Sequence, residues 1–444
     1  MALGGGTFAS QNKILAGTYI NFVSASKATA TVGDRGYAAM ALELDWGPEG
    51  TIIEVTNGDF QKNSMTLFGY DYADEKMKGL RDLFANAKTL YTYRLNGGGA
   101  KASNTYATAK HSGTRGNDLR VVIQVNEEET SNYDVSLYLG SVYVDKQTVK
   151  AATELKDNDY VSWKTDASLE AVAGVSLTGG TNGTADSSAH QAFLDKLESY
   201  PAINAVGVVS TEGTISGLYA AYTKRMREEV GVKFQTVVYG KAADYEGVVN
   251  VKNAVTDSGW TEAALVYWAT GVIAGCAVNA SNTNKKYDGE FTVNTDYTQK
   301  QLEKAISDGE FAFHRVGQDI RVLKDINSLV TTAADKGDIF KSNQTIRVID
   351  QIATDIAGIF ATKYLGVIPN DADGRASLWS DIAYEHQQLQ DMRAIENFDE
   401  TAIVVMQGND KAQCSHGYYY CSKCNGQAVH DGYRAVRRGY GDFI

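Results

Sequence analysis

One stretch, from Gln344 to Asp410, constrains the fold of this chain more than any other. It opens with "QTIRVIDQIATDIAGIFATKYLG", where apolar residues recur every three or four positions, as on one face of an α-helix. Gly366 and Pro369 are expected to end this helix. The next segment repeats the helical spacing at Leu378, Ile382, Leu389, Met392 and Ile395. "ETAIVVMQGND" then predicts a strand and a turn. Because none of these elements carries a catalytic pattern, the stretch indicates a packing and docking module.

The order of residues in and before this stretch resembles the C-terminal part of contractile phage tail sheath proteins, from myophages or R-type bacteriocins. The residues that carry the resemblance are Asp325, Ile326, Asn327, Arg347, Ala394, Ile395, Phe398, Gly408, Asn409, Asp410 and Lys411. Upstream, the pair Gly33 and Gly36, the Trp46-Gly47-Pro48 turn and the "GTRGND" turn from Gly113 are similar to the same family. The resemblance therefore covers nearly the whole chain up to about Lys411.

Length and composition bound the remaining possibilities. A chain of 444 residues with 43% hydrophobic residues can form two to four domains with real cores. No apolar run reaches eighteen residues, and the N-terminus lacks a basic region followed by an apolar core, so we expect no membrane span and no signal peptide. The net charge of −12 opposes wrapping around a phosphate backbone. The 26 tyrosines and 43 glycines favour extensive protein interfaces.

These patterns predict an α+β, multi-domain fold with a β-barrel or sandwich domain inserted in mixed α/β domains, and the resemblance implies extended terminal arms. The inserted domain is expected where apolar and polar residues alternate, and the larger α/β domain where strand, helix and strand patterns follow one another. The expected parts are an N-terminal arm (1–20), an α/β segment (21–99), the β-domain (100–178), the α/β domain (185–340), a C-terminal core module (341–411) and an atypical C-terminal arm (412–444). The resemblance implies that the N-terminal arm links subunits and that the core module faces the tube.

Two alternatives remain open: a nucleotide-binding α/β enzyme using the strand–helix–strand unit near residues 200–275, and a surface adhesin or S-layer-like protein. The glycine-rich turns lack the lysine of a P-loop, and no G-x-G-x-x-G follows the first strand of that unit. Cys276 is expected to be a core thiol inside an apolar helix, and His314 a structural histidine within a hairpin. We therefore expect no enzyme activity and no cofactor.

The chain departs from the sheath pattern after Lys411. The ending offers Cys414, His416, Cys421 and Cys424 as weak zinc ligands, because a C-x-x-C pair can hold a metal ion. A second hypothesis explains the same ending without a zinc site. Back-translating residues 413–436 and shifting the frame by one base allows "SVVTVTITVANAMAKLYMTVTV", which alternates as strands do and resembles the sheath ending. The ending is then a frameshifted version of a sheath C-terminus.

The resemblance also implies function and partners. It implies a structural subunit that polymerises as stacked rings around a tail tube and contracts to drive the tube through the host envelope. The implied partners are further copies of this chain, the tail tube protein, and the baseplate and tail terminator proteins, without nucleic acid or membrane contact. The implied location is the virion tail, assembled in the host bacterial cytoplasm. The arm residues that would pair with a neighbour are Leu15, Tyr19, Ile20 and Phe22, and the expected tube-facing residues are Asp381, Glu385, Gln388 and Arg393.

Overall fold

A seven-stranded sheet organises the computed structural model, which describes residues 34–407, 414–417 and 421–422. The strands follow the order β13-β12-β11-β10-β1-β3-β2, and all neighbours are parallel except β2 and β3. Their bounds are β1 Tyr37–Leu42, β2 Ile52–Thr56, β3 Thr89–Arg94, β10 Ala205–Gly207, β11 Gln235–Tyr239, β12 Val248–Val251 and β13 Glu310–Phe311. The central strand β1 reads "YAAMAL", the continuous apolar run expected of a parallel strand covered on both faces.

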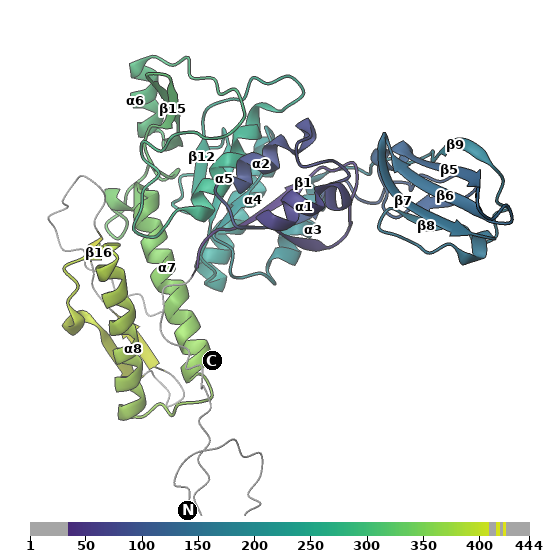
Figure 1. Ribbon diagram of the computed structural model, residues 1–444. Helices are drawn as coiled ribbons and strands as arrows, with labels where there is room; N and C mark the ends of the chain where they lie inside the picture. The colour runs from purple at the N-terminus through teal and green to yellow at the C-terminus, as the bar shows by residue number, and fades with distance from the viewer. Residues whose placement is uncertain (1–33, 408–413, 418–420, 423–444) are drawn as a thin grey trace, which may run out of the picture.

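Helices cover both faces of this sheet (Figure 1). Met40 and Leu42 of β1 share one core with α1 (Asn57–Phe68), α2 (Lys78–Phe84) and α5 (Val266–Gly275). Ala39 and Ala41 point to the opposite core, which contains α3 (Ser187–Leu197) and α4 (Gly213–Arg225). The two cores alternate along β1 because successive side chains of a strand point to opposite faces. The short helix α6 (Gln299–Ser307) leads into β13.

A β-sandwich is inserted between β3 and α3 and projects from the body (Figure 1). Its larger sheet has the order β7-β6-β5-β9 and its smaller sheet pairs β4 with β8, all antiparallel. The bounds are β4 Ala107–Ala109, β5 Leu119–Val125, β6 Tyr133–Leu139, β7 Val142–Val149, β8 Val161–Trp163 and β9 Val172–Ser176. Val135, Leu137 and Leu139 alternate into the sandwich core. The predicted α+β fold with an inserted β-domain is confirmed.

The two linkers to the sandwich pass very close to each other. A Cβ atom on Gly99 would lie 1.9 Å from the carbonyl oxygen of Thr181, and one on Gly183 would lie 1.9 Å from that of Gly97. Arg94, 2% exposed at the end of β3, donates to the carbonyl oxygens of Gly47 (3.1 Å) and Ser112 (2.8 Å). The sandwich is therefore attached through a tightly packed, hydrogen-bonded junction.

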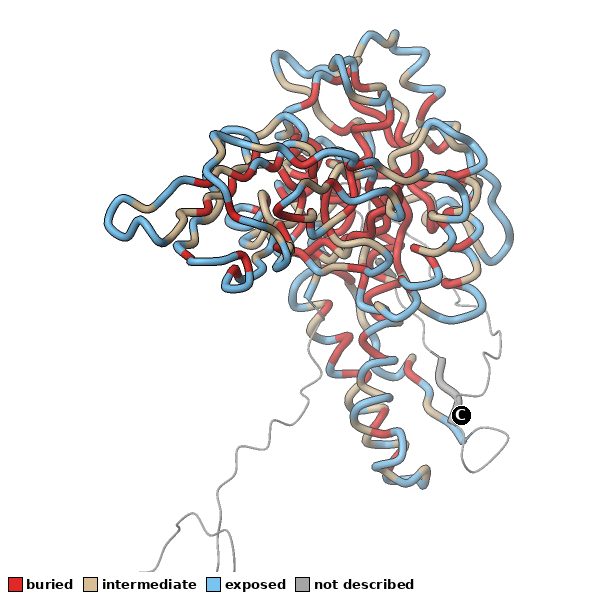
Figure 2. The backbone as a smooth tube through the Cα atoms, turned by 90° about the vertical axis from the view of Figure 1, so that its right-hand side faces the viewer, coloured by how far each residue is buried: buried red, intermediate tan, exposed pale blue. Residues whose placement is uncertain are grey.

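The hairpin β14 (Phe313–Val316) and β15 (Asp319–Val322) leads towards two long helices, α7 (Asn343–Ile359) and α8 (Ala372–Asp391). They share a core that includes Ile352, Ile382 and Leu389. Short strands complete this part: β16 Ile395–Glu396 pairs with β19 Cys421–Ser422, and β17 Val404–Gln407 pairs with β18 Cys414–Gly417. Figure 2 shows buried backbone concentrated in the α/β body and interrupted along the two projecting helices.

The helix–helix–strand prediction is confirmed in its elements but wrong at one boundary. A five-residue π-helical turn, Phe360–Tyr364, extends α7, and Gly366 follows with a left-handed φ of 71°. α8 ends at Asp391, so Met392 and Ile395 lie beyond it although they fit the helical spacing. Arg393 adopts φ 64°, a left-handed backbone that interrupts a right-handed helix. No helix within the described ranges is both long and apolar enough to cross a membrane.

Candidate functional site

A crevice at the carboxyl ends of the parallel strands is where an α/β enzyme would bind its ligand. It has a volume of about 720 Å³, and its lining includes Glu43 and Asp45 after β1 and Glu212 at the start of α4. With Asp186, four carboxylates line the crevice beside one lysine, Lys76, and they oppose a phosphate group. The N-cap residue Glu212 makes no side-chain capping hydrogen bond. The lining therefore does not favour the nucleotide alternative.

Asp45 in this crevice serves the domain junction. Asn182 of the return linker and Tyr70 donate to its carboxylate at 2.8 and 2.7 Å. Burial alone would raise the pKa of Asp45, but these hydrogen bonds and Lys76 lower it. Burial and the contact with Asp45 raise the pKa of the Tyr70 hydroxyl. These polar groups satisfy one another and hold the sandwich to the body.

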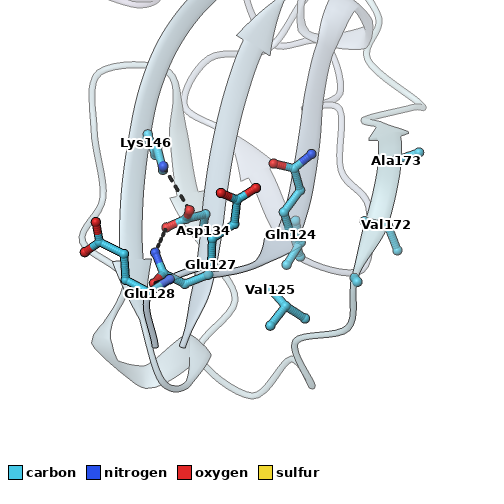
Figure 3. A pocket seen from close by; sticks show the side chains of 11 residues that line it. Gln124, Val125, Glu127, Glu128, Asp134, Lys146, Val172 and Ala173 are labelled. Carbon is cyan, nitrogen blue, oxygen red and sulfur yellow. Dashed lines mark hydrogen bonds and ion pairs between the residues drawn. The ribbon is translucent and has the colours of Figure 1, made fainter. Parts of the chain in front are cut away.

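A second depression, of about 810 Å³, lies on the sandwich between the end of β5 and the start of β9 (Figure 3). Asp134 accepts hydrogen bonds from Asn126 (3.0 Å) and Thr148 (2.6 Å) and pairs with Lys146 at 2.9 Å. The hydrogen bonds from Thr148, Lys146 and Asn126 lower the pKa of Asp134 to about 2. Asp134 and Lys146 at this open surface pair within the domain, which is typical of a solvated surface.

Cys276 and His314, which the sequence analysis named, lie in different parts of the fold. Cys276 is the half-buried C-cap of α5, outside the helix that was expected to contain it, because the helix ends at Gly275. Burial raises the pKa of its thiol. His314 lies in the predicted hairpin, opposite Arg321. Within the described residues, no group of three or more His, Cys, Asp or Glu side chains is arranged to hold a metal ion.

The zinc candidates lie at the edge of what the structure describes. Cys414 and His416 belong to β18, opposite Gln407 and Val405 of β17. Cys421 pairs with Glu396, while Cys424 lies outside the described residues. The arm residues Leu15, Tyr19, Ile20 and Phe22 also lie outside them.

The four expected tube-facing residues do not form one exposed helical face. Asp381 is half-buried and bonds to Lys363 at 2.5 Å, and Gln388 is also half-buried. Glu385 is fully buried beside His386, with 2.8 Å between its Oε2 and the ring Nδ1. Arg393 is exposed but lies beyond the end of α8. Glu385 lies on the same side of α8 as Leu378, Ile382 and Leu389, and the packing of α8 buries that side.

The helical part does expose large apolar side chains. Val404 and Met406 of β17 are 41% and 51% exposed. Leu365 and Val367, in the turn between α7 and α8, are 50% and 70% exposed. Tyr384 on α8 is 53% exposed. Apolar side chains gathered on one projecting part are typical of a surface that other protein chains cover.

Two buried ion pairs, which we call the α7 joint, connect α7 to the α/β body. Arg227, in the π-helical turn Met226–Val230 that follows α4, donates to both carboxylate oxygens of Asp350 at 2.5 and 2.7 Å. Arg347 donates to Asp325 at 3.3 Å and to the carbonyl oxygen of Ala280 at 2.9 Å. All four side chains are at most 9% exposed. Buried charges need such partners, so the direction of α7 is set by specific acceptors.

α7 has a buried half, which contains the α7 joint, and a more exposed half that projects from the body. The first half, from Asn343 to Asp350, is almost entirely buried in the body, whereas Thr354, Ala357 and Gly358 further along are exposed. At 1.5 Å per residue, a helix of this length extends about 25 Å. One continuous helix thus links the body rigidly to the projecting part with α8 (Figure 1).

Sequence reasoning noted Arg347 and Asp325 only as parts of a pattern and missed Arg227 and Asp350. The available signal was the presence of two charged residues, Arg347 and Asp350, in a helical segment whose other residues are largely apolar. Their partners lie far away in the chain, so spacing could not identify them.

Comparison with known families gives four matches in chain order. They are the tail sheath protein Gp18 domain III N-terminal region at residues 35–95, the phage tail sheath protein beta-sandwich domain at 96–182, the phage tail sheath protein central domain at 183–328 and the phage tail sheath C-terminal domain at 335–419. The α7 joint therefore connects the segments matched by the central and C-terminal domains.

Individual proteins match over most of their length. A crystal structure of the sheath tail protein from Desulfitobacterium hafniense is 35% identical, with a TM-score of 0.82 over 91% of this chain and 96% of that one. The corresponding protein from Listeria innocua is 31% identical, with a TM-score of 0.76 over 89% and 94%. The phage-like element PBSX protein XkdK of Bacillus subtilis (strain 168) is 31% identical over 92% of this chain and 94% of its own length.

Proposed function

This chain belongs to the phage tail sheath family, and we propose that it polymerises as stacked rings around a tail tube and contracts to drive that tube through the host cell envelope. Its role is structural. The observation that carries the proposal is the succession of four sheath domains along the chain, together with a solved sheath protein matched over 96% of its length.

The shape of the subunit supports a mechanism without bond-making chemistry. A sheath that contracts must change the contacts between subunits while each subunit keeps its own fold. The buried ion pairs of the α7 joint and the close linkers of the sandwich favour such rigid motion. Energy is then stored in the packing between copies, and contraction releases it as subunits reach more favourable contacts.

The N-terminal arm, residues 1–20, links neighbouring subunits in this proposal by adding a strand to a neighbour. Leu15, Tyr19 and Ile20, with Phe22 just after the arm, are the proposed pairing residues. Contacts of this head-to-tail kind build open filaments rather than closed dimers. The partners are other copies of the chain, the tube protein, and the baseplate and terminator proteins. Assembly takes place in the host cytoplasm.

The projecting part with α7 and α8 is proposed to face the tube. Asp381, Gln388 and Arg393 remain the candidate contacts, whereas the buried Glu385 supports the helix from inside. Arg393→Glu reverses an exposed charge and is expected to weaken co-sedimentation with the tube protein. Lys300→Glu, an exposed reversal on α6, is the matched control.

Electron microscopy of the purified chain tests the proposal as a whole. We expect the full chain to form tubes or sheath-like filaments, and a chain lacking residues 1–20 to remain a folded, dispersed subunit. Dispersed wild-type subunits at high concentration would argue against a sheath. Normal tubes from the shortened chain would argue against the arm alone.

A further inference from the structure

The described chain begins beside α7, where the side chain of Arg35 enters the body. Its Nε donates to the carbonyl oxygen of Cys276 at 2.9 Å, and its Nη2 donates to that of Ile273 at 3.3 Å. Its Nη1 donates to Oε1 of Gln351, on α7, at 3.5 Å. One side chain near the start of the described residues thus contacts both α5 and α7.

The two carbonyl groups are favourable partners for a guanidinium. The carbonyl of Ile273 belongs to the last turn of α5, where carbonyl groups lack partners within the helix and carry the negative end of its dipole, and the carbonyl of Cys276 belongs to the C-cap residue that follows. The planar guanidinium presents five N–H donors in a fixed geometry, whereas the lysine ammonium has three donors on a flexible stem and does not match the same set of acceptors. Burial, together with the nearby charge of Arg347, lowers the pKa of Arg35 to about 10, so the side chain stays charged at neutral pH.

The backbone that follows Arg35 is held as firmly. The amides of Gly36 and Tyr37 both donate to Oδ1 of Asn204, at 2.9 and 3.1 Å. The amide of Lys88 donates to the carbonyl oxygen of Gly36 at 2.9 Å. Tyr37 then begins β1, the strand between β10 and β3. A force applied to the chain before residue 34 is therefore transmitted to α5, α7 and the sheet.

We infer that Arg35 is a positioning residue that anchors the N-terminal segment, residues 1–33, at the α7 joint. Tension that a neighbouring subunit applies to this segment is carried by Arg35 to α5 and α7, and so to the projecting helices as well as to the sheet. This inference rests on the proposed function, in which the N-terminal arm links neighbouring subunits.

A nearby ion pair provides a matched control. Asp34 pairs with Lys88 at 2.5 Å, but both side chains are about 60% exposed (63% and 60%). Such exposed pairs contribute little because water screens them. Asp34 also accepts a hydrogen bond from the backbone amide of Arg35 at 3.0 Å, and asparagine keeps a side-chain oxygen for it. Asp34→Asn therefore removes the ion pair and leaves the guanidinium contacts of Arg35 in place.

The test measures how sheath tubes break. Tubes of the full-length chain are passed through a narrow capillary at fixed shear, and their lengths are followed by negative-stain electron microscopy. We expect Arg35→Met tubes to break about ten times faster than wild type, since a hydrogen bond to a charged group contributes at least a factor of ten. Arg35→Lys should fall between the two, and Asp34→Asn should match wild type.

The possible outcomes distinguish the anchoring role of Arg35 from the proposed sheath function. Wild-type breakage in Arg35→Met, with a normal melting temperature, would overturn the anchoring role and leave the sheath function intact. If Arg35→Met does not fold, Arg35→Lys decides, and lengths equal to wild type would overturn the anchor. Tubes formed normally without residues 1–20 would instead refute the linking arm. If Asp34→Asn tubes broke as fast as Arg35→Met tubes, the loss of strength would not be specific to Arg35.

Discussion

Breaking the buried pair between Arg227 and Asp350 is expected to be costly at the α7 joint. The side chains are 6% and 9% exposed, and both carboxylate oxygens accept hydrogen bonds. Asp350→Ala leaves a buried guanidinium whose remaining acceptor is the carbonyl oxygen of Phe234 at 2.8 Å. Removing one partner of a buried pair costs about 3–5 kcal/mol, so we expect a loss of that size in the free energy of unfolding.

The companion substitutions determine how much of this loss belongs to the pair. Arg227→Met leaves Asp350 uncompensated and should cost a similar amount. The double variant Arg227→Met/Asp350→Leu replaces both charges by apolar groups of similar size, and it should recover most of the loss. Glu198→Ala is the control, because it breaks the exposed pair with Arg225 on the same helix and should cost less than about 1 kcal/mol.

Urea unfolding of the purified subunit, followed by circular dichroism, measures all four free energies. Hydrogen exchange at Val348 and Ile352 shows whether α7 loosens from the body in the single variants. The reasoning is refuted if the double variant loses the sum of the two single losses, because the two charges would then not interact. It is also refuted if Asp350→Ala costs no more than Glu198→Ala.

Three further predictions concern other parts of the chain. Gly99→Ala should destabilise the sandwich junction by about 1–3 kcal/mol, because its Cβ would overlap the backbone at Thr181, whereas Gly213→Ala has open space and should leave the melting temperature unchanged. Burial raises the pKa of Asp82 to about 6 from 3.8, so its stabilising contribution is complete below about pH 4 and is lost as the pH rises through 6, by about 3 kcal/mol in total. Asp82→Asn should remove this dependence from unfolding curves measured between pH 3 and 8, and an unchanged dependence would contradict the assignment. Finally, sequencing of the gene across Lys411–Cys424 should reveal the shifted frame; an in-frame gene, with an intact mass that matches the printed residues, would remove the frameshift hypothesis and leave zinc binding to be tested by metal analysis.

Local patterns by themselves determined much of the C-terminal architecture. The spacing of Ile346, Ile352 and Ile356 predicted α7, and all three side chains are buried in the structure. The apolar run of β1 and the alternation in β6 likewise determine which faces are covered. These predictions succeed because a helix or strand is defined by neighbours within a few residues, and its periodicity is written directly in the chain.

Only the tertiary structure decided what the charged residues do. Arg35 contacts residues more than 230 positions away, and Arg227 reaches Asp350 across 123 positions. Glu385, expected among the tube-facing residues, is fully buried on the side of α8 that carries Ile382 and Leu389. A charge can enter the interior wherever a partner from any other segment meets it there, and which segments meet depends on the whole fold. Periodicity therefore predicts the elements of this subunit, while the joint between them follows from their three-dimensional packing.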